Sequence, residues 1–174
     1  MSVDTGFFPS VLNAVEDRNE QQKKVLVQKI VQRFGTDLCG RTFAVWGLAF
    51  KPGTDDMREA SSRVILEELV SADATIQAFD PVAMAQAAKE LPKEWLDTGR
   101  LVLTEDLYQA LENADALILV TEWKTFRQPD FKLMGELMRQ KIIFDGRNQY
   151  DPEEVGEFGF EYFGIGRENT GSGN

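Results

Sequence analysis

The chain has 174 residues, of which 43% are hydrophobic, enough to form about one domain with a buried core. Its 29 acidic and 19 basic residues give a net charge of −10, which argues against nucleic-acid binding because most of the surface would repel phosphates. The absence of histidine removes Ser-His-Asp catalysis and most transition-metal sites, and a single cysteine leaves no intramolecular disulfide. No apolar run approaches the about 20 residues that span a bilayer, and no signal peptide is visible, so we expect a cytoplasmic protein.

A long helix is predicted from Pro9 to Phe34. Two apolar patches at helical spacing lie toward its ends, and nine consecutive polar residues from Glu16 to Lys24 separate them. The polar middle is either a solvated part of an ordinary helix or the exposed part of a helix that bridges two bodies. Because helices of this length are unusual in small domains, we favour a bridging or dimerising helix region over residues 1–36, with Gly35 following the helix.

Beyond Gly40, short apolar runs alternate with helical segments. The predicted strands are Thr42 to Trp46, Thr75 to Phe79, Leu101 to Leu103, Ala116 to Val120, Lys141 to Phe144 and Phe160 to Phe163. The predicted helices are Arg58 to Val70 (inner face Val64, Ile65, Leu66 and Leu69), Val82 to Glu90, a segment ending at Glu112 and capped by Thr104, Phe131 to Arg139 capped by Asp130, and Pro152 to Phe158. This alternation indicates an α/β domain over residues 37–166, with a doubly wound, Rossmann-like, mostly parallel sheet of five to six strands. Residues 167–174 are predicted to be a disordered tail.

Charged residues follow several of these strands, at the edge of the sheet where doubly wound domains bind ligands. Lys51 comes after the first strand, and a lysine there either binds a phosphate or sugar hydroxyl or pairs with a nearby acid. Arg58 follows Asp55–Asp56, and from the residues alone we favour an ion pair that holds the loop. Arg147 follows the fifth strand, where Asp145 could orient it, and structural and ligand-binding roles stand equal. The loop from Gly47 to Arg58 is interrupted by glycine and proline and carries two cations, Lys51 and Arg58. Such a loop suits a phosphorylated or nucleotide ligand.

Asp80 ends the second strand, where dinucleotide-binding domains place an acid that binds ribose. The first strand is followed only by Gly47 and Gly53, without a Gly-x-Gly-x-x-Gly motif, so no standard pyrophosphate site is predicted. We therefore interpret Asp80 and Pro81 as a turn that starts a helix.

Two tryptophans and the cysteine are further candidate site residues. Trp46 and Trp123 could stack on a base, but single tryptophans more often pack in the core. Cys39 has no acid or base near it in sequence and is interpreted as an ordinary small residue. No catalytic residue and no metal ligand is predicted in this chain.

The stretch from Gly47 to Ser62 closely resembles the C-terminal domain signature of the UDP-glucose/GDP-mannose dehydrogenase family, nearest to its UDP-glucose 6-dehydrogenase branch. Other segments agree with the family in order and spacing: Asn19 to Lys23, Phe79 to Pro81, Ala114 to Ala116, Thr121 to Trp123 and Phe144 to Asn148. The resemblance covers the chain from about Phe7 to Arg167.

The resemblance implies a mechanism and a set of site residues. In the family, an N-terminal domain binds NAD, and a central cysteine attacks the C6 aldehyde; two hydrides go to two NAD molecules and UDP-glucuronate, a polysaccharide precursor, is released. By position, Phe50, Lys51 and Arg147 are implied to contact the UDP-sugar. Arg58 is implied to reach the NAD cofactor, which reverses the structural role favoured above. The long helix is implied to join the domains and to form a homodimer.

The sequence also differs from the family. It lacks a glycine-fingerprint NAD domain and the segment that carries the nucleophilic cysteine, and Cys39 lies on the wrong side of the long helix. Ala60-Ser61 stands in place of the Ala-Pro of many bacterial members, and Gly53 stands where Asn or Asp is common. We expect the C-terminal, nucleotide-sugar-binding part of such an enzyme, inactive by itself. A GDP-mannose or UDP-N-acetylhexosamine dehydrogenase fragment and a non-catalytic binding or assembly module are the alternatives.

Overall fold

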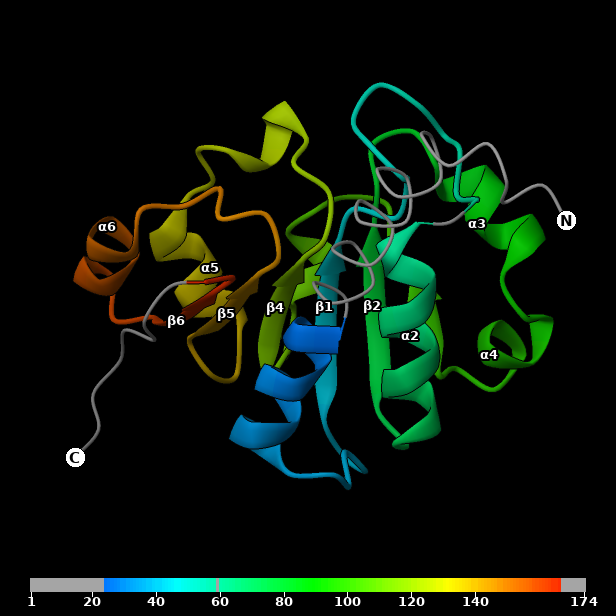
Figure 1. The fold of residues 1–174 in the computed structure, drawn as a ribbon, viewed down its shortest axis with the longest axis horizontal. Coiled ribbons are helices and arrows are strands. Elements are labelled where there is room, and N and C mark those ends of the chain that lie inside the picture. The colour runs from blue at the N-terminus through cyan, green and yellow to red at the C-terminus, as the bar shows by residue number, and fades with distance from the viewer. Residues whose placement is uncertain (1–23, 59, 167–174) are drawn as a thin grey trace, which may run out of the picture.

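A computed structural model describes residues 24–58 and 60–166 (Figure 1). The predicted residues 9–23 of the long helix and the predicted tail 167–174 lie outside this range. Residues 24–34 are helical, as predicted for the end of the long helix. The helix ends at Gly35, whose φ of +92° and amide hydrogen bond to the Val31 carbonyl at 2.7 Å confirm it as the residue that terminates the helix.

Six strands form one sheet in the order β3-β2-β1-β4-β5-β6, and every neighbouring pair is parallel. Their bounds are β1 Thr42–Trp46, β2 Thr75–Phe79, β3 Leu101–Leu103, β4 Ala116–Leu119, β5 Ile142–Asp145 and β6 Glu161–Gly164. This confirms the doubly wound parallel sheet. The strand order reverses between β1 and β4, so the switch point, where such sheets bind ligands, lies beyond the ends of these two strands.

Helices cover both faces of the sheet. They are α2 Ser61–Ser71, α3 Met84–Glu90, α4 Lys93–Asp97, α5 Phe131–Leu137 and α6 Pro152–Glu157, with 3-10 turns η2 Gln109–Leu111 and η3 Lys124–Phe126. Alternate residues of β1 face opposite sides: Phe43 and Val45 join the core under segment 24–34, α2 and α3, while Ala44 and Trp46 join the core under η2, α5 and α6. This two-sided burial explains the unbroken apolar sequence of the strand.

The end of the long helix packs on the sheet of its own chain. Leu26 and Ile30 are buried in the first core, and the Phe34 ring meets the Phe43 ring edge-on at 5.3 Å between centroids. Residues 24–34 therefore contribute to the core of this domain, and the bridging or dimerising role of the helix stays a prediction.

The segment after β3 differs from the predicted helix capped by Thr104. The Thr104 hydroxyl donates to the Ala78 and Asp106 carbonyls instead of accepting from a helix amide, and the Asp106 carboxylate accepts from the Tyr108 and Gln109 amides. Because the hydroxyl ties the strand end to β2, the segment forms only the short η2 turn.

One further helix prediction was wrong in detail, and one short helix was missed. α2 begins at Ser61, not at Arg58, and its buried face includes Ser62 in place of the half-exposed Val64. The missed helix is α4, which begins just after Pro92. The same proline favours an extended Leu91 before it, so α3 ends at Glu90. The predicted cap of α5 is confirmed, since the Asp130 carboxylate accepts from the Leu133 amide at 3.0 Å.

Candidate functional site

The loop after β1 begins with a close contact between two strand ends. Gly47 has a φ of +98°, and a Cβ placed on it would lie 2.5 Å from the backbone nitrogen and Cβ of Thr121, which follows β4. The Thr121 hydroxyl donates to the Ala49 carbonyl at 2.7 Å, and the Ser62 hydroxyl donates to the Leu48 carbonyl at 2.7 Å. These contacts hold the first residues of the loop at the switch point of the sheet.

Asp80, at the end of β2, joins three loops through a buried carboxylate. Its Oδ2 accepts from the Leu48 amide at 2.8 Å, the Ala49 amide at 3.0 Å and the Trp123 indole Nε1 at 3.1 Å. Its Oδ1 accepts from the amides of Val82 and Ala83, which confirms the predicted turn. With 1% of its surface exposed, Asp80 is no ribose ligand. Its hold on the two amides also takes up donors that a pyrophosphate would need in this loop.

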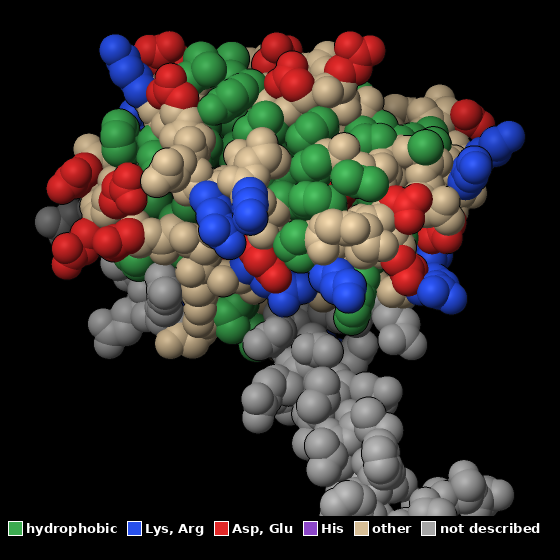
Figure 2. Space-filling model, turned by 90° about the horizontal axis from the view of Figure 1, so that it is seen from above, with side chains coloured by type: hydrophobic (Ala, Val, Ile, Leu, Met, Phe, Trp, Pro, Cys, Tyr) green, Lys and Arg blue, Asp and Glu red, His purple; other side chains and the backbone are tan. Residues whose placement is uncertain are grey.

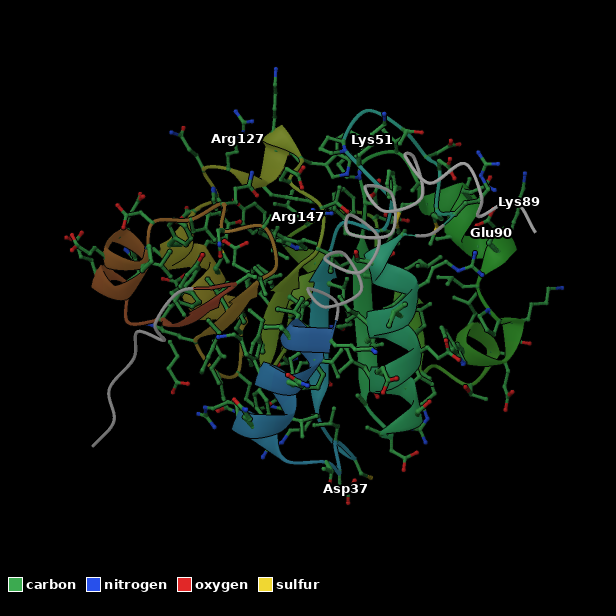
Figure 3. All side chains as sticks on the ribbon, in the orientation of Figure 1. Asp37, Lys51, Lys89, Glu90, Arg127 and Arg147 are labelled. Atoms are coloured by element: carbon green, nitrogen blue, oxygen red, sulfur yellow. The ribbon has the colours of Figure 1, made fainter. Side chains whose placement is uncertain are left out.

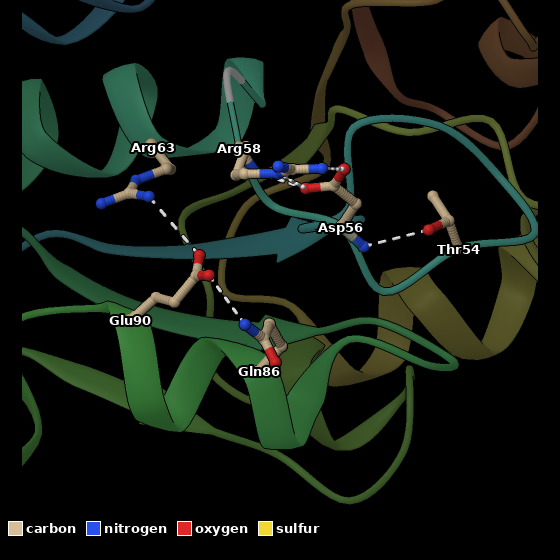
Figure 4. A network of polar contacts seen from close by, with 6 residues as sticks. All are labelled: Thr54, Asp56, Arg58, Arg63, Gln86 and Glu90. Atoms are coloured by element: carbon tan, nitrogen blue, oxygen red, sulfur yellow. Dashed lines mark hydrogen bonds and ion pairs between the residues drawn. The ribbon is translucent and has the colours of Figure 1, made fainter.

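The rest of the loop is closed by its own polar groups (Figure 4). The Phe50 amide donates to the Asp56 carbonyl, and the Arg58 guanidinium pairs with the Asp56 carboxylate through Nε at 3.1 Å and Nη2 at 3.0 Å. The hydrogen bonds from Arg58 lower the pKa of Asp56 below its ordinary value. The ion pair expected from the residues alone is therefore present, and it lies on the surface, with 82% of the Arg58 side chain exposed.

Lys51 lies at the top of this loop, beyond the carboxyl ends of the strands (Figure 3), and Phe50 directly precedes it in the chain. The Lys51 side chain is exposed, and so is 43% of Phe50, one of the few large apolar side chains of the described residues to be so. Both residues can therefore be reached by a ligand at this edge.

Arg147 is held at the same edge by groups from two strands. Its Nε donates to the Val120 carbonyl at 2.9 Å and lies 3.0 Å from the Glu122 carboxylate. The Asp145 carboxylate orients it through the Arg147 backbone amide, at 2.9 Å, and not through the guanidinium. Since Nε faces the protein, the terminal nitrogens of the guanidinium are the groups that a ligand could use.

Behind Arg147 lies a buried polar cluster that the sequence did not reveal. The second oxygen of Asp145 accepts from the Tyr162 hydroxyl at 2.8 Å and from the Tyr150 amide at 3.0 Å. The Tyr150 hydroxyl donates to the Phe126 carbonyl at 2.6 Å, and burial, aided by the charge of Asp145, raises the pKa of Tyr150. Asp145 is thus a buried anchor and the last residue of β5, whereas the predicted strand ended at Phe144.

The two tryptophans pack as favoured from the sequence. Trp46 is fully buried and stacks on Phe126 with ring centroids 4.9 Å apart, so it is no base-stacking residue. Trp123 donates its indole proton to Asp80, and its carbonyl accepts from the Gln149 side chain at 3.2 Å. Gln149 joins the loops after β4 and β5, a role that no sequence pattern indicated.

Cys39 lies far from this edge, next to Asp37, whose carboxylate accepts from the Cys39 amide at 3.0 Å. Figure 3 places Asp37 at the opposite end of the strands from Lys51 and Arg147. Within residues 24–58 and 60–166, no group of three or more metal-ligating side chains comes together. No helix in the same part of the chain has the length and apolar character of a membrane span.

The sequence and fold match those of nucleotide-sugar dehydrogenases. The profile of the UDP-glucose/GDP-mannose dehydrogenase family, UDP binding domain, matches residues 44–152. The chain is 49% identical over 166 residues to a UDP-glucose 6-dehydrogenase of Pseudomonas aeruginosa, covering 95% of this chain and 36% of the relative. It is 38% identical over 157 residues to one of Bacillus subtilis, covering 90% and 34%.

A solved UDP-glucose dehydrogenase from the archaeon Pyrobaculum islandicum superposes with a TM-score of 0.69 at 30% identity, over 87% of this chain and 32% of that one. The chain therefore spans about a third of the length of the relatives that it matches. From the matched family profile and the parallel sheet, the chain belongs to the UDP-glucose/GDP-mannose dehydrogenase family and contains its UDP binding domain.

Proposed function

We propose that this chain is the nucleotide-sugar-binding part of an NAD-dependent UDP-glucose 6-dehydrogenase, and that Phe50, Lys51 and Arg147 contact the UDP-sugar. The observation that carries the proposal is the position of Lys51 and Arg147, two reachable cations at the switch-point edge of a UDP binding domain. An anionic diphosphate in an otherwise acidic protein needs such a local concentration of positive charge.

The residues of this chain do not fit an NAD pyrophosphate in the loop after β1. Asp80 already holds the Leu48 and Ala49 amides, and no glycine fingerprint follows the strand. We therefore propose that NAD is bound mainly by another part of the enzyme. Arg58, which is exposed at the end of the loop, would contact the NAD that is held there. For that contact, Arg58 would exchange its bond to Asp56 for one to the cofactor.

Dimerisation through the long helix also remains a proposal. Leu26 and Ile30 are buried against the chain's own sheet, so they are not available to a second copy. A dimer contact would have to use other residues of the helix, and light scattering on the 174-residue chain measures it directly. The cytoplasmic location expected from the sequence stays a prediction.

Calorimetric titration with UDP tests the main proposal. We expect the 174-residue chain to bind UDP and UDP-glucose weakly and to show no reduction of NAD in the presence of UDP-glucose. Lys51→Ala and Arg147→Ala should each weaken UDP binding about tenfold, because each removes a charge-assisted hydrogen bond. Arg100→Ala, which breaks an exposed pair with Asp73, is the matched control and should leave binding unchanged.

Turnover by this chain alone would contradict the proposal. So would UDP binding that neither Lys51→Ala nor Arg147→Ala weakens. Preference for GDP or for an N-acetylated UDP-hexosamine over UDP-glucose would favour the alternative substrates.

A further inference from the structure

Arg127 differs from the other described arginines in having no acidic partner. Seven arginines within residues 24–58 and 60–166 form ion pairs with Asp or Glu at 2.8–3.6 Å: Arg33, Arg41, Arg58, Arg63, Arg100, Arg139 and Arg147. Arg127 is exposed, and no carboxylate of the described chain pairs with it. In a protein with 29 acidic residues, an arginine left unpaired in a fixed place has its five donors available to an outside anion.

The turn that carries Arg127 is firmly anchored. Arg127 directly follows η3, where its amide donates to the Lys124 carbonyl at 3.1 Å. Between them, Phe126 is fully buried, stacks on Trp46 and accepts the Tyr150 hydroxyl proton at its carbonyl. The backbone of the turn is thus fixed while the side chains of Lys124 and Arg127 project into solvent, which reduces the entropy lost when they bind.

The same anchoring ties this turn to the two loops of the proposed site. Trp46 is the last residue of β1 and directly precedes the loop of Lys51, and Tyr150 closes the loop of Arg147. Figure 3 shows Arg127 and Lys51 at the same edge of the sheet as Arg147. Figure 2, which looks onto this edge, shows several basic side chains near the middle of the face with an acidic one among them, and others at the margins, where most of the acidic side chains lie.

We propose that Arg127, assisted by Lys124, binds a phosphate of the nucleotide diphosphate that occupies this edge, and that the η3 turn is a third arm of the site beside the loops of Lys51 and Arg147. The inference rests on the proposed function. A diphosphate presents two anionic groups, so cations on separate loops can each bind one of them. Because Asp80 takes up the amides after β1, side-chain cations must supply more of this binding than in a glycine-rich loop.

The test measures UDP and NAD binding separately, by calorimetry on the 174-residue chain at low salt. Arg127→Ala should raise the UDP dissociation constant about tenfold, and Arg127→Lys should restore part of the affinity because it keeps the charge and loses the forked geometry. The effect of Arg127→Ala should shrink as salt is added. Arg100→Ala is again the control, and thermal unfolding of Arg127→Ala should match that of the unsubstituted chain.

The outcomes separate this inference from the proposed function. Weaker UDP binding with unchanged NAD binding assigns the phosphate to the nucleotide-sugar, and the reverse assigns it to the dinucleotide. If UDP binds and Arg127→Ala changes neither ligand, the role of Arg127 is overturned and the proposed function stands. If the unsubstituted chain binds neither ligand at millimolar concentration, both are overturned.

Discussion

Gly47 and Thr121 lie so close that no side chain fits between them: a Cβ on Gly47 would stand 2.5 Å from the Thr121 backbone nitrogen. Glycine is required here for a second reason, because a φ of +98° belongs to a region that other residues rarely adopt. Gly47 is therefore the point at which the loops after β1 and β4 are joined at the edge of the sheet.

Gly47→Ala should lower the free energy of unfolding by at least about 2 kcal/mol, because it combines backbone strain with a clash against Thr121. Gly53→Ala is the matched control: Gly53 also has a positive φ, +86°, but nothing lies within 4 Å of the added Cβ, so about 1 kcal/mol is expected. Urea unfolding of both variants measures the difference. Equal losses would mean that the contact with Thr121 has no energetic weight.

Asp80→Asn should be strongly destabilising, although the two side chains have nearly the same size. The carboxylate accepts from five donors, and an amide group would present two N–H donors to amides that need acceptors. We expect a loss of about 2–4 kcal/mol, since buried amides are left unpaired. Asp106→Asn, in an exposed turn, should cost less than about 0.5 kcal/mol, because asparagine replaces aspartate readily in such turns. A stable Asp80→Asn variant would show that this carboxylate does not organise the loops.

The central strand β1 was predictable because its burial is two-sided: an unbroken run such as Phe43 to Trp46 suits only a strand covered on both faces. β2 and β3 also have the predicted bounds, although only some of their residues are buried. The alternation of strands and helices predicted a parallel sheet. In such a sheet the loops of Lys51 and Arg147 lie at the same, carboxyl edge. These inferences depend on periodicity alone, which is a local property of the sequence.

The parts that were missed depend on partners distant in sequence. The Thr104 hydroxyl has the features of a helix cap, but Ala78, 26 positions earlier, supplies a carbonyl that it bonds to instead. The acceptor role of Asp80 depends on Leu48 and Trp123, and the lack of an acidic partner for Arg127 among residues 24–58 and 60–166 depends on where every nearby carboxylate lies. No local pattern contains these facts, so they become visible only once the loops are placed.

The Asp56–Arg58 pair should shift the pKa of Asp56 but contribute little to the free energy of unfolding, because it lies on the surface. Since hydrogen bonds from Arg58 lower the pKa of Asp56, Arg58→Ala should return that pKa toward its ordinary value of 3.8. A lowered carboxyl pKa adds stability above the unfolded-state pKa, and this is lost as the pH falls through the folded-state value. Carbon-detected NMR of the Asp56 carboxyl group measures the shift. An Asp56 pKa that does not respond to Arg58→Ala would argue against the ion pair.

Tyr150→Phe should loosen the turn that carries Arg127. The change removes the 2.6 Å bond to the Phe126 carbonyl and should cost about 1–2 kcal/mol, whereas Tyr108→Phe, which removes an exposed bond from the Asp130 amide, should cost less. Burial raises the pKa of Tyr150, so its contribution is present below the ordinary tyrosine pKa of about 10 and is lost as the pH rises toward the folded-state value. Thermal unfolding between pH 7 and 11 should therefore show a steeper alkaline loss for the unsubstituted chain than for Tyr150→Phe. If the two curves run parallel, Tyr150 ionises as freely in the folded chain as in the unfolded one, and the hydrogen bond that anchors the η3 turn is absent in solution.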